Sequence, residues 1–235
     1  MTEEQQRTEL ESLCRARGAA GFGVAELSRV RTDDFLLPAD ALASYTVAVS
    51  IAMRVSGEVL ATLAERPNAL YEHHYRQVNF ALDRLALDMA NRIHALGGRA
   101  LPIAASQLVD WENQRGHLSH KRIAVAAGVG WLGRNNLLVT PGCGAQVRLV
   151  SVLTDLSLPG DSAMAGGCGE CRCCVDACPC GAIGETAAEF RHRDCFALLK
   201  EFQRKHYVSQ CICGLCVRAC TGRSGLARVP ELPAD

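Results

Sequence analysis

The sequence has few aromatic residues and no excess of charge of either sign. Aromatic side chains make up 5% of the 235 residues, and 25 Lys and Arg balance 25 Asp and Glu. A formal net charge of +0 provides no overall positive field that would attract nucleic acid, so the composition predicts no nucleic-acid partner. The longest apolar segment, from Tyr45 to Met53, is too short to cross a bilayer.

The N-terminus lacks the features of a targeting signal. Its first residues, MTEEQQRTELE, are polar and acidic, with no basic start and no apolar core. The 13 cysteines have a better explanation than secretion, so we expect a cytoplasmic protein in a reducing compartment, with no membrane partner. Apolar residues make up 49% of the chain, which suits one α/β domain plus a small appended module.

The most informative feature is a run of cysteines between residues 168 and 220. The first four follow the pattern C-x2-C-x2-C-x3-C with Pro179 directly after them, which is the spacing of bacterial ferredoxins. A second run has the pattern C-x2-C-x3-C, and Cys195 lies between the two runs. In two-cluster ferredoxins the fourth cysteine of a run binds the other cluster. The pattern therefore predicts two 4Fe–4S clusters.

The same spacing predicts which cysteines share a cluster. The first cluster is expected on Cys168, Cys171, Cys174 and Cys220. The second cluster is expected on Cys178, Cys195, Cys213 and Cys216. Three neighbours could substitute for these ligands, namely Cys173, Cys180 and Cys211. The alternatives to iron–sulfur clusters are a disulfide framework or a zinc site. Zinc sites use four ligands in two C-x2-C pairs, whereas here the second pair has a third cysteine at a ferredoxin offset, which disfavours zinc.

Hydrophobic periodicity predicts a mixed α/β domain before the cysteines. Helices are expected over residues 3–17, 55–64 and 78–96 and in a segment ending at Ala127, and strands over residues 20–25, 44–53, 99–105, 137–140 and 146–154. We expect the 44–53 strand to be buried on both faces and Pro102 to mark a sheet edge or a bulge. The last two strands are expected to form a hairpin with its tip at residues 141–144.

A change in composition marks the end of this domain. Residues 158–167 are rich in Pro, Gly, Ser and Ala, as linkers are. We therefore expect an α/β domain over residues 1–160, a cysteine module over residues 161–224 and a tail without a fold of its own over residues 225–235.

A polar stretch before a glycine-rich turn contains the candidate catalytic residues. Its ionisable members are Asp110, Glu112, His117 and His120. A histidine has a suitable pKa for a proton donor, whereas the alternative is a solvated loop in which Ser119 caps the next helix. A second polar segment, residues 71–76, could line a pocket, but an exposed helix start is the favoured interpretation.

The turn itself reads GVGWLGRNN over residues 128–136. Three glycines would allow its backbone to approach something large. It is no nucleotide fingerprint, because its glycines follow a helix and lead into a strand.

The stretch AGVGWLGRNNLLVTPGCGAQVRLVSVLTD, followed by the two-cluster cysteine pattern, resembles the epoxyqueuosine reductases and their shorter relatives. These share a cobalamin-plus-two-cluster plan with the reductive dehalogenases. The resemblance implies a nitroreductase-like α/β domain that binds base-off cobalamin, followed by a ferredoxin-like module with two 4Fe–4S clusters. It also implies the following cobalamin contacts: Gly130, Trp131, Gly133, Arg134 and Asn135.

Two departures from the family bear on function. The position that matches the family's catalytic aspartate falls near Gln114, and the sequence ends at Asp235 before the helical-repeat domain that helps hold tRNA in the family. We expect a cobalamin-dependent, two-cluster reductase of a small molecule, supplied by a low-potential donor such as ferredoxin or flavodoxin. The alternatives are an electron-transfer protein with no substrate of its own, and a tRNA epoxyqueuosine reductase acting with a separate tRNA-binding subunit.

Overall fold

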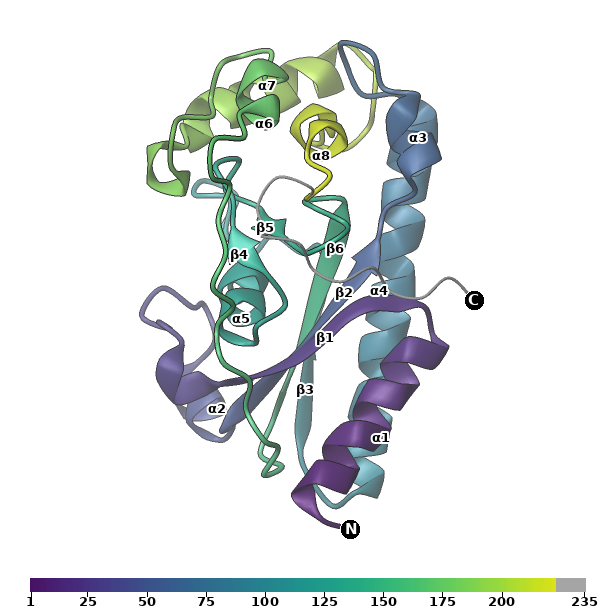
Figure 1. The fold of residues 1–235 in the computed structure, drawn as a ribbon, viewed down its shortest axis with the longest axis vertical. Coiled ribbons are helices and arrows are strands. Elements are labelled where there is room, and N and C mark those ends of the chain that lie inside the picture. Colours follow the sequence, from purple (N-terminus) through teal and green to yellow (C-terminus); the bar gives the residue numbers. More distant parts are fainter. Residues whose placement is uncertain (223–235) are drawn as a thin grey trace.

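A four-stranded antiparallel sheet forms the centre of the computed structural model, which describes residues 1–222 (Figure 1). Its order is β1 (Ala19–Glu26), β2 (Val47–Arg54), β6 (Val147–Thr154) and β3 (Ala100–Ile103). The predicted α/β class is confirmed, and β3, which contains Pro102, lies at an edge as expected. The predicted tail over residues 225–235 lies outside the described residues.

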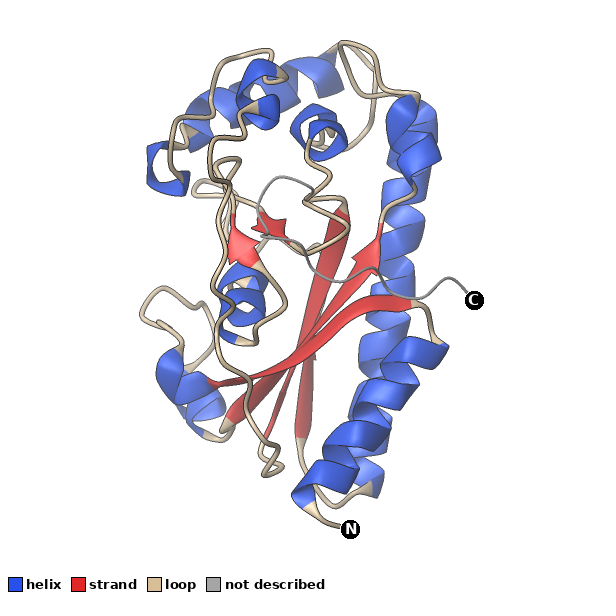
Figure 2. Cartoon of the chain, in the orientation of Figure 1, coloured by secondary structure: helices blue, strands red, loops and turns tan. Residues whose placement is uncertain are grey.

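Helices cover both faces of the sheet (Figures 1 and 2). α1 (Glu3–Ala16) and α4 (Ala69–Ala95) pack on one face, where Val49 and Ile51 of β2 are fully buried. α5 (His120–Ala126) packs on the other face, where β2 presents the small side chains Ala48 and Ala52. The prediction that β2 is buried on both faces is confirmed.

Polar caps determine where the two long helices begin. Thr2 and Gln5 form a capping box at the start of α1, and the Asn68 side chain accepts the backbone N–H of Tyr71 at the start of α4. The segment over residues 71–76 is therefore the first part of α4. Its expected exposure is wrong at Tyr71 and Glu72, which are buried.

The hairpin predicted over residues 137–154 is absent from the described residues. β5 (Leu138–Val139) pairs instead with β4 (Trp131–Leu132) in a separate two-stranded sheet, while β6 joins the central sheet. The turn between β5 and β6 is closed by an isolated bridge from Thr140 to Gly144. The glycine-rich turn thus becomes part of a small β-structure beside the cysteine module.

The remaining elements are short. Before the cysteine module they are η1 (Leu27–Arg29), α2 (Ala39–Ala43) and α3 (Gly57–Ala61), and within it they are α6 (Cys173–Asp176), η2 (Ala187–Glu189), α7 (His192–Arg204) and α8 (Leu215–Ala219). α6, α7 and α8 lie together at one end of the sheet, at the top of Figure 1. Within residues 1–222 no helix is both long and apolar enough to span a membrane.

The cysteine module shares a hydrophobic core with the preceding part of the chain. Leu60 and Leu63 from the α3 region and Tyr71 from α4 are buried against Phe202 of α7 and Leu215 of α8. A Cβ atom at Gly214 would lie 2.7 Å from the Tyr71 ring, so this helix start requires a glycine. The position of the module is therefore set by packing against α3 and α4, not by the linker alone.

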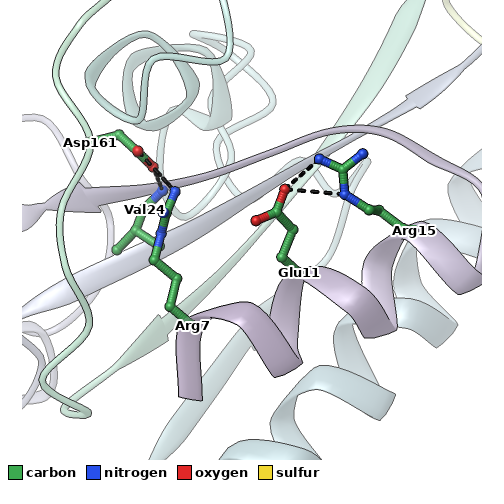
Figure 3. Close-up of polar contacts among 5 residues, drawn as sticks. All are labelled: Arg7, Glu11, Arg15, Val24 and Asp161. Atoms are coloured by element: carbon green, nitrogen blue, oxygen red, sulfur yellow. Dashed lines mark hydrogen bonds and ion pairs between the residues drawn. The ribbon is translucent and has the colours of Figure 1, made fainter. Parts of the chain in front are cut away.

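The linker is also fixed to the sheet (Figure 3). Arg7 of α1 donates to both carboxylate oxygens of Asp161 at 2.9 Å, and the backbone N–H of Val24 donates to Asp161 Oδ2 at 2.8 Å. The N–H of Asp161 in turn donates to the Val24 carbonyl at 2.8 Å. The chain therefore runs along β1 before it reaches the cysteine module.

Candidate cluster sites and active-site cavity

Four cysteines from opposite ends of the module surround one small cavity. They are Cys168, Cys171, Cys174 and Cys220, and Trp131, Asn135 and Cys173 complete much of the lining. The pKa of Cys174 is raised to about 11, first by burial and then by the neighbouring thiols of Cys220 and Cys168. We call these four residues the first cysteine group. The structure thus brings Cys220 beside the cysteines with which the sequence paired it.

The other four predicted ligands form a second cysteine group, made of Cys178, Cys195, Cys213 and Cys216. Burial raises the pKa of Cys195 to about 12, and nearby Cys180, Cys213 and Cys178 add to the effect. Burial also raises the pKa of Cys216, with further contributions from Cys213, Cys195 and Cys178. Because thiols with raised pKa values stay protonated at neutral pH, they would lose protons on binding iron.

The thiols of the first cysteine group are arranged around a cavity. Among residues 1–222, no three His, Cys, Asp or Glu side chains are close enough to hold one metal ion. Two of the three extra cysteines lie beside predicted ligands: Cys180 Sγ is 3.8 Å from Cys178 Sγ, and Cys173 interacts with Cys171. Cys211 donates to Gln203 Oε1 at 3.4 Å, away from both groups.

The glycine-rich turn packs against the first cysteine group. A Cβ atom at Gly133 would lie 2.6 Å from Val139 Cγ2 and 3.6 Å from Cys168 Sγ, and one at Gly130 would collide with the Val139 carbonyl. Arg134 Nη2 donates to the Gly169 carbonyl at 2.9 Å, which ties the turn to the cysteine loop. These glycines are explained by contacts with the chain itself, and the cobalamin contacts predicted for this turn stay a prediction.

A cavity of about 470 Å³ lies between the end of the sheet and the cysteine module. Its walls come from the 114–122 segment, from β6 through Arg148, from α4 through Tyr71 and Tyr75, and from α8 through Val217. Val217 follows Cys216 directly, so this cavity adjoins the second cysteine group. The cavity combines apolar walls with a few polar groups, as small-molecule sites do.

Cationic side chains line the cavity from two elements, α5 and β6. Lys121 donates to the Asn136 carbonyl at 2.7 Å and to its Oδ1 at 3.0 Å, and burial lowers the pKa of Lys121 to about 8. Arg122 forms an ion pair with Asp34. The guanidinium carbon of Arg148 lies 4.4 Å from the centroid of the Tyr75 ring. The wall therefore favours an anionic or strongly polar ligand.

His120 lies in the cavity wall, but both of its ring nitrogens have protein partners. Nε2 lies 3.0 Å from the Ala104 carbonyl, which can only accept, so Nε2 carries the proton. Nδ1 then accepts from the Ser151 hydroxyl at 2.8 Å. Burial lowers the pKa of His120 to about 4, so the ring is neutral at pH 7. This geometry holds the 114–122 segment against β6.

The other candidate catalytic residues lie outside the cavity lining. Asp110 forms an ion pair with Arg115 and accepts from Asn113, and its pKa is well below the usual range because of these bonds. Glu112 is exposed at the tip of the same loop, and His117 lines a smaller neighbouring cavity. Their catalytic role stays a prediction that the geometry does not favour.

Two cationic side chains that line the cavity, Lys121 and Arg148, are not predicted from the sequence. Tyr75 also lines it, as the less favoured pocket interpretation of residues 71–76 expects. Tyr75, whose hydroxyl lies 3.3 Å from Ser106 Oγ, was assigned to an exposed helix start. Gln114, near which the sequence places the match to the family's aspartate, lines the cavity and has a left-handed φ of 56°. Tyr75 lies one helical turn after Tyr71, on the face of α4 that points toward the cysteine module, and this spacing is the sequence feature that indicates its place in the cavity wall.

Comparison of sequences finds epoxyqueuosine reductases. The chain is 27% identical over 183 residues to the epoxyqueuosine reductase of Bacillus anthracis, which covers 77% of this chain and 46% of that protein. The chain therefore spans about half the length of the curated relatives it matches. No protein-family model matches the chain.

Comparison of structures finds the same enzymes and the reductive dehalogenases. The reductive dehalogenase NpRdhA superimposes with a TM-score of 0.70 and 19% identity, over 93% of this chain and 32% of that one. Epoxyqueuosine reductase from Streptococcus thermophilus superimposes with a TM-score of 0.63 and 20% identity, over 96% and 68%. Another epoxyqueuosine reductase, bound to a modified tRNA stem loop, has a TM-score of 0.57.

These likenesses define the class of protein. The fold is the mixed α/β fold that reductive dehalogenases, described as B12-dependent, share with epoxyqueuosine reductases. Within that class, the chain resembles the epoxyqueuosine reductases in sequence as well, so the predicted resemblance is confirmed. A neighbour that binds a tRNA stem loop stands in part against the prediction of no nucleic-acid partner.

Proposed function

We propose that the chain is a reductase of the epoxyqueuosine reductase type, with two 4Fe–4S clusters and a cobalamin. The nitroreductase-like domain would be residues 1–160, and the ferredoxin-like module would be residues 161–224. The observation that carries the proposal is the division of eight cysteines into two spatial groups that cross the sequence order, one of them adjoining a large cavity. Crossed thiolate groups are the ferredoxin arrangement.

The side chains present suit both kinds of cofactor. Each cysteine group offers four thiols, and the cavity of the first group is lined by no carboxylate among the described residues but by Trp131 and Asn135, which carry unpartnered buried N–H groups. The large cavity offers apolar walls and cationic side chains next to the second group. A bound cobalamin would supply a reduced cobalt centre for the difficult bond-breaking step.

The chain's own residues would bind the substrate and supply a proton. Lys121 and Arg148 would hold an anionic or polar substrate, and Tyr75 is the hydroxyl group best placed in the wall to donate a proton. Removal of an epoxide oxygen as water consumes two electrons and two protons. The electrons would come from a low-potential donor such as ferredoxin or flavodoxin, through the clusters.

Anaerobic reconstitution tests the cofactors. We expect about eight irons and about eight acid-labile sulfides per chain. With hydroxocobalamin added at micromolar concentration, cobalt should co-elute with the protein in gel filtration and be reduced through the clusters. Iron and sulfide without bound cobalt would leave the electron-carrier alternative. Zinc without sulfide would contradict the proposal altogether.

The substrate has two candidates, a free small molecule and the same group carried on tRNA. The second is supported by another cavity, of about 610 Å³, which shares Lys121 and Arg122 with the cavity of about 470 Å³ and is also lined by Arg29 and Arg31. Arg29, Arg31 and Arg122 each pair with a carboxylate, so a phosphate would bind by competing for these guanidinium groups. Turnover of epoxyqueuosine as the free nucleoside and within a tRNA stem loop, compared at low and high salt, would distinguish the two candidates.

A further inference from the structure

Two residues that line the cavity of the first cysteine group carry buried N–H groups without a partner. Trp131 is 4% exposed and Asn135 is 3% exposed, and both side chains line that cavity. Trp131 Nε1 and Asn135 Nδ2 have no hydrogen-bond partner within residues 1–222. An unsatisfied buried donor costs about 1–3 kcal/mol, so each of these groups calls for an acceptor in the cavity.

Both donors are held in place. Asn135 Oδ1 accepts the backbone N–H of Leu137 at 3.2 Å, which settles that the unpartnered amide atom is the nitrogen. A Cβ atom at Gly166 would lie 2.7 Å from the Trp131 ring, so the indole packs directly on the linker backbone. Val139 and Ala145 are buried against the same ring in a small core. Both N–H groups are therefore buried away from water, beside packed or hydrogen-bonded atoms.

Most side-chain acceptors in the lining of this cavity are cysteine sulfurs, beside the hydroxyl oxygen of Thr221. Apart from Trp131 and Asn135, its lining consists of Val139, cysteines and the short segment that ends α8. A cluster on the four thiols would bring thiolate and sulfide sulfurs into a cavity where two N–H groups have no other partner. Hydrogen bonds from N–H groups to cluster sulfurs are one of the factors that set a cluster's reduction potential.

We propose that Trp131 Nε1–H and Asn135 Nδ2–H donate hydrogen bonds to sulfurs of the cluster on Cys168, Cys171, Cys174 and Cys220 and raise its reduction potential. This inference rests on the proposed function, because it requires that cluster. The step concerned is the transfer of one electron from the external donor to the cluster, with no proton transferred. The reduced cluster carries one more negative charge, so N–H donors stabilise it more than the oxidised form.

The deciding variant is Trp131→Phe, which keeps the aromatic packing and removes only the N–H. The signal of the first cluster is the paramagnetic resonance signal that Cys174→Ala abolishes. In a redox titration of the reconstituted protein, Trp131→Phe should shift the one-electron equilibrium of that cluster about tenfold toward the oxidised form, which corresponds to about 59 mV. The second cluster should keep its midpoint. The matched control is Trp111→Phe, at a tryptophan that is 69% exposed, and it should change neither midpoint.

A second measurement needs no substitution at the site. The chain has two tryptophans, so ¹⁵N-indole labelling in a Trp111→Phe background marks Trp131 alone. Pulsed paramagnetic resonance of the reduced first cluster should then show coupling to ¹⁵N. An unchanged midpoint in Trp131→Phe overturns this inference and leaves the two-cluster reductase intact. If Trp131→Phe does not assemble its first cluster, the absence of ¹⁵N coupling in the labelled Trp111→Phe protein overturns the inference in the same way. Wild-type protein that takes up no iron overturns the proposed function and this inference with it.

Discussion

The buried carboxylate of Glu72 on α4 accepts hydrogen bonds from Ser209, 137 residues later in the chain. The Ser209 backbone N–H lies 3.0 Å from Oε1 and 2.9 Å from Oε2, and its hydroxyl donates to Oε1 as well. Ser209 precedes the loop that carries Cys213 and Cys216. The first turn of α4 therefore holds the second cysteine group by a charged, multidentate contact next to the shared core around Tyr71.

Loss of this contact should loosen the cysteine module. We expect Glu72→Ala to destabilise the protein by about 1.5 kcal/mol, the low end for hydrogen bonds to a charged group because Ser209 is accessible to water. For a chain of this length the unfolding midpoint should fall by about 3–6 °C, measured calorimetrically on reconstituted protein. Glu65→Ala, at an exposed glutamate nearby, should leave the midpoint unchanged. Equal shifts in the two variants would contradict the role of the contact.

The crossed cysteine groups predict which cluster each substitution removes. Cys178→Ala should damage the cluster of Cys213 and Cys216, while Cys220→Ala should damage the cluster of Cys168 to Cys174, read by paramagnetic resonance of the reduced protein. Cys180 lies 3.8 Å from Cys178 and is the nearest substitute ligand, so the Cys178 variant should also carry Cys180→Ala. Cys211→Ala is the cysteine control and should keep both signals. If each substitution removed the cluster of its own sequence run, the crossing would be wrong.

The sequence predicted the elements better than their partners. The apolar run of β2 and the periodic pattern of α4 were correct because burial and helix periodicity are local properties. The pairing of β5 with β4 was missed because Pro141 and Gly142 satisfy a hairpin turn and a simple bend equally well. The spacing of the cysteines also predicted the two spatial groups, since ferredoxin chemistry constrains it.

The cavity could not be predicted from residue types. His120 was a reasonable proton donor by its ordinary pKa, but its neutrality depends on Ser151 and the Ala104 carbonyl, which are distant in the chain. Tyr75 enters the wall only because α4 begins at Ala69 and its first turns pack on α8. In both cases the role of the side chain depends on tertiary packing, which cannot be inferred from a single sequence.

The structure separates two positions that the family resemblance would treat alike. Val147 lines the cavity of about 470 Å³, so Val147→Trp should abolish cobalamin binding while both clusters are kept. Gly133 lies beside Cys168, so Gly133→Leu should first damage the cluster of Cys168 to Cys174. Iron, sulfide and cobalt contents after anaerobic gel filtration report both effects. Val109→Trp, at an exposed valine outside the cavity, is the matched control. Full cobalamin binding by Val147→Trp would place the cofactor elsewhere.

The buried neutral His120 should make stability depend on pH. Burial lowers its pKa to about 4 in the folded chain, against about 6.5 when unfolded, so the unfolded state binds more protons between these values. Stability from this group is fully present above pH 6.5 and falls by about 3 kcal/mol as the pH drops to 4. Denaturant unfolding of wild type and His120→Gln across this pH window isolates the contribution of His120, because the carboxylates titrate equally in the two proteins. The variant should lose most of the slope, and His94→Gln, at an exposed histidine of α4, should retain it. Parallel curves for wild type and His120→Gln would mean that His120 has the same pKa in the folded and unfolded chain, which would contradict the effect of burial.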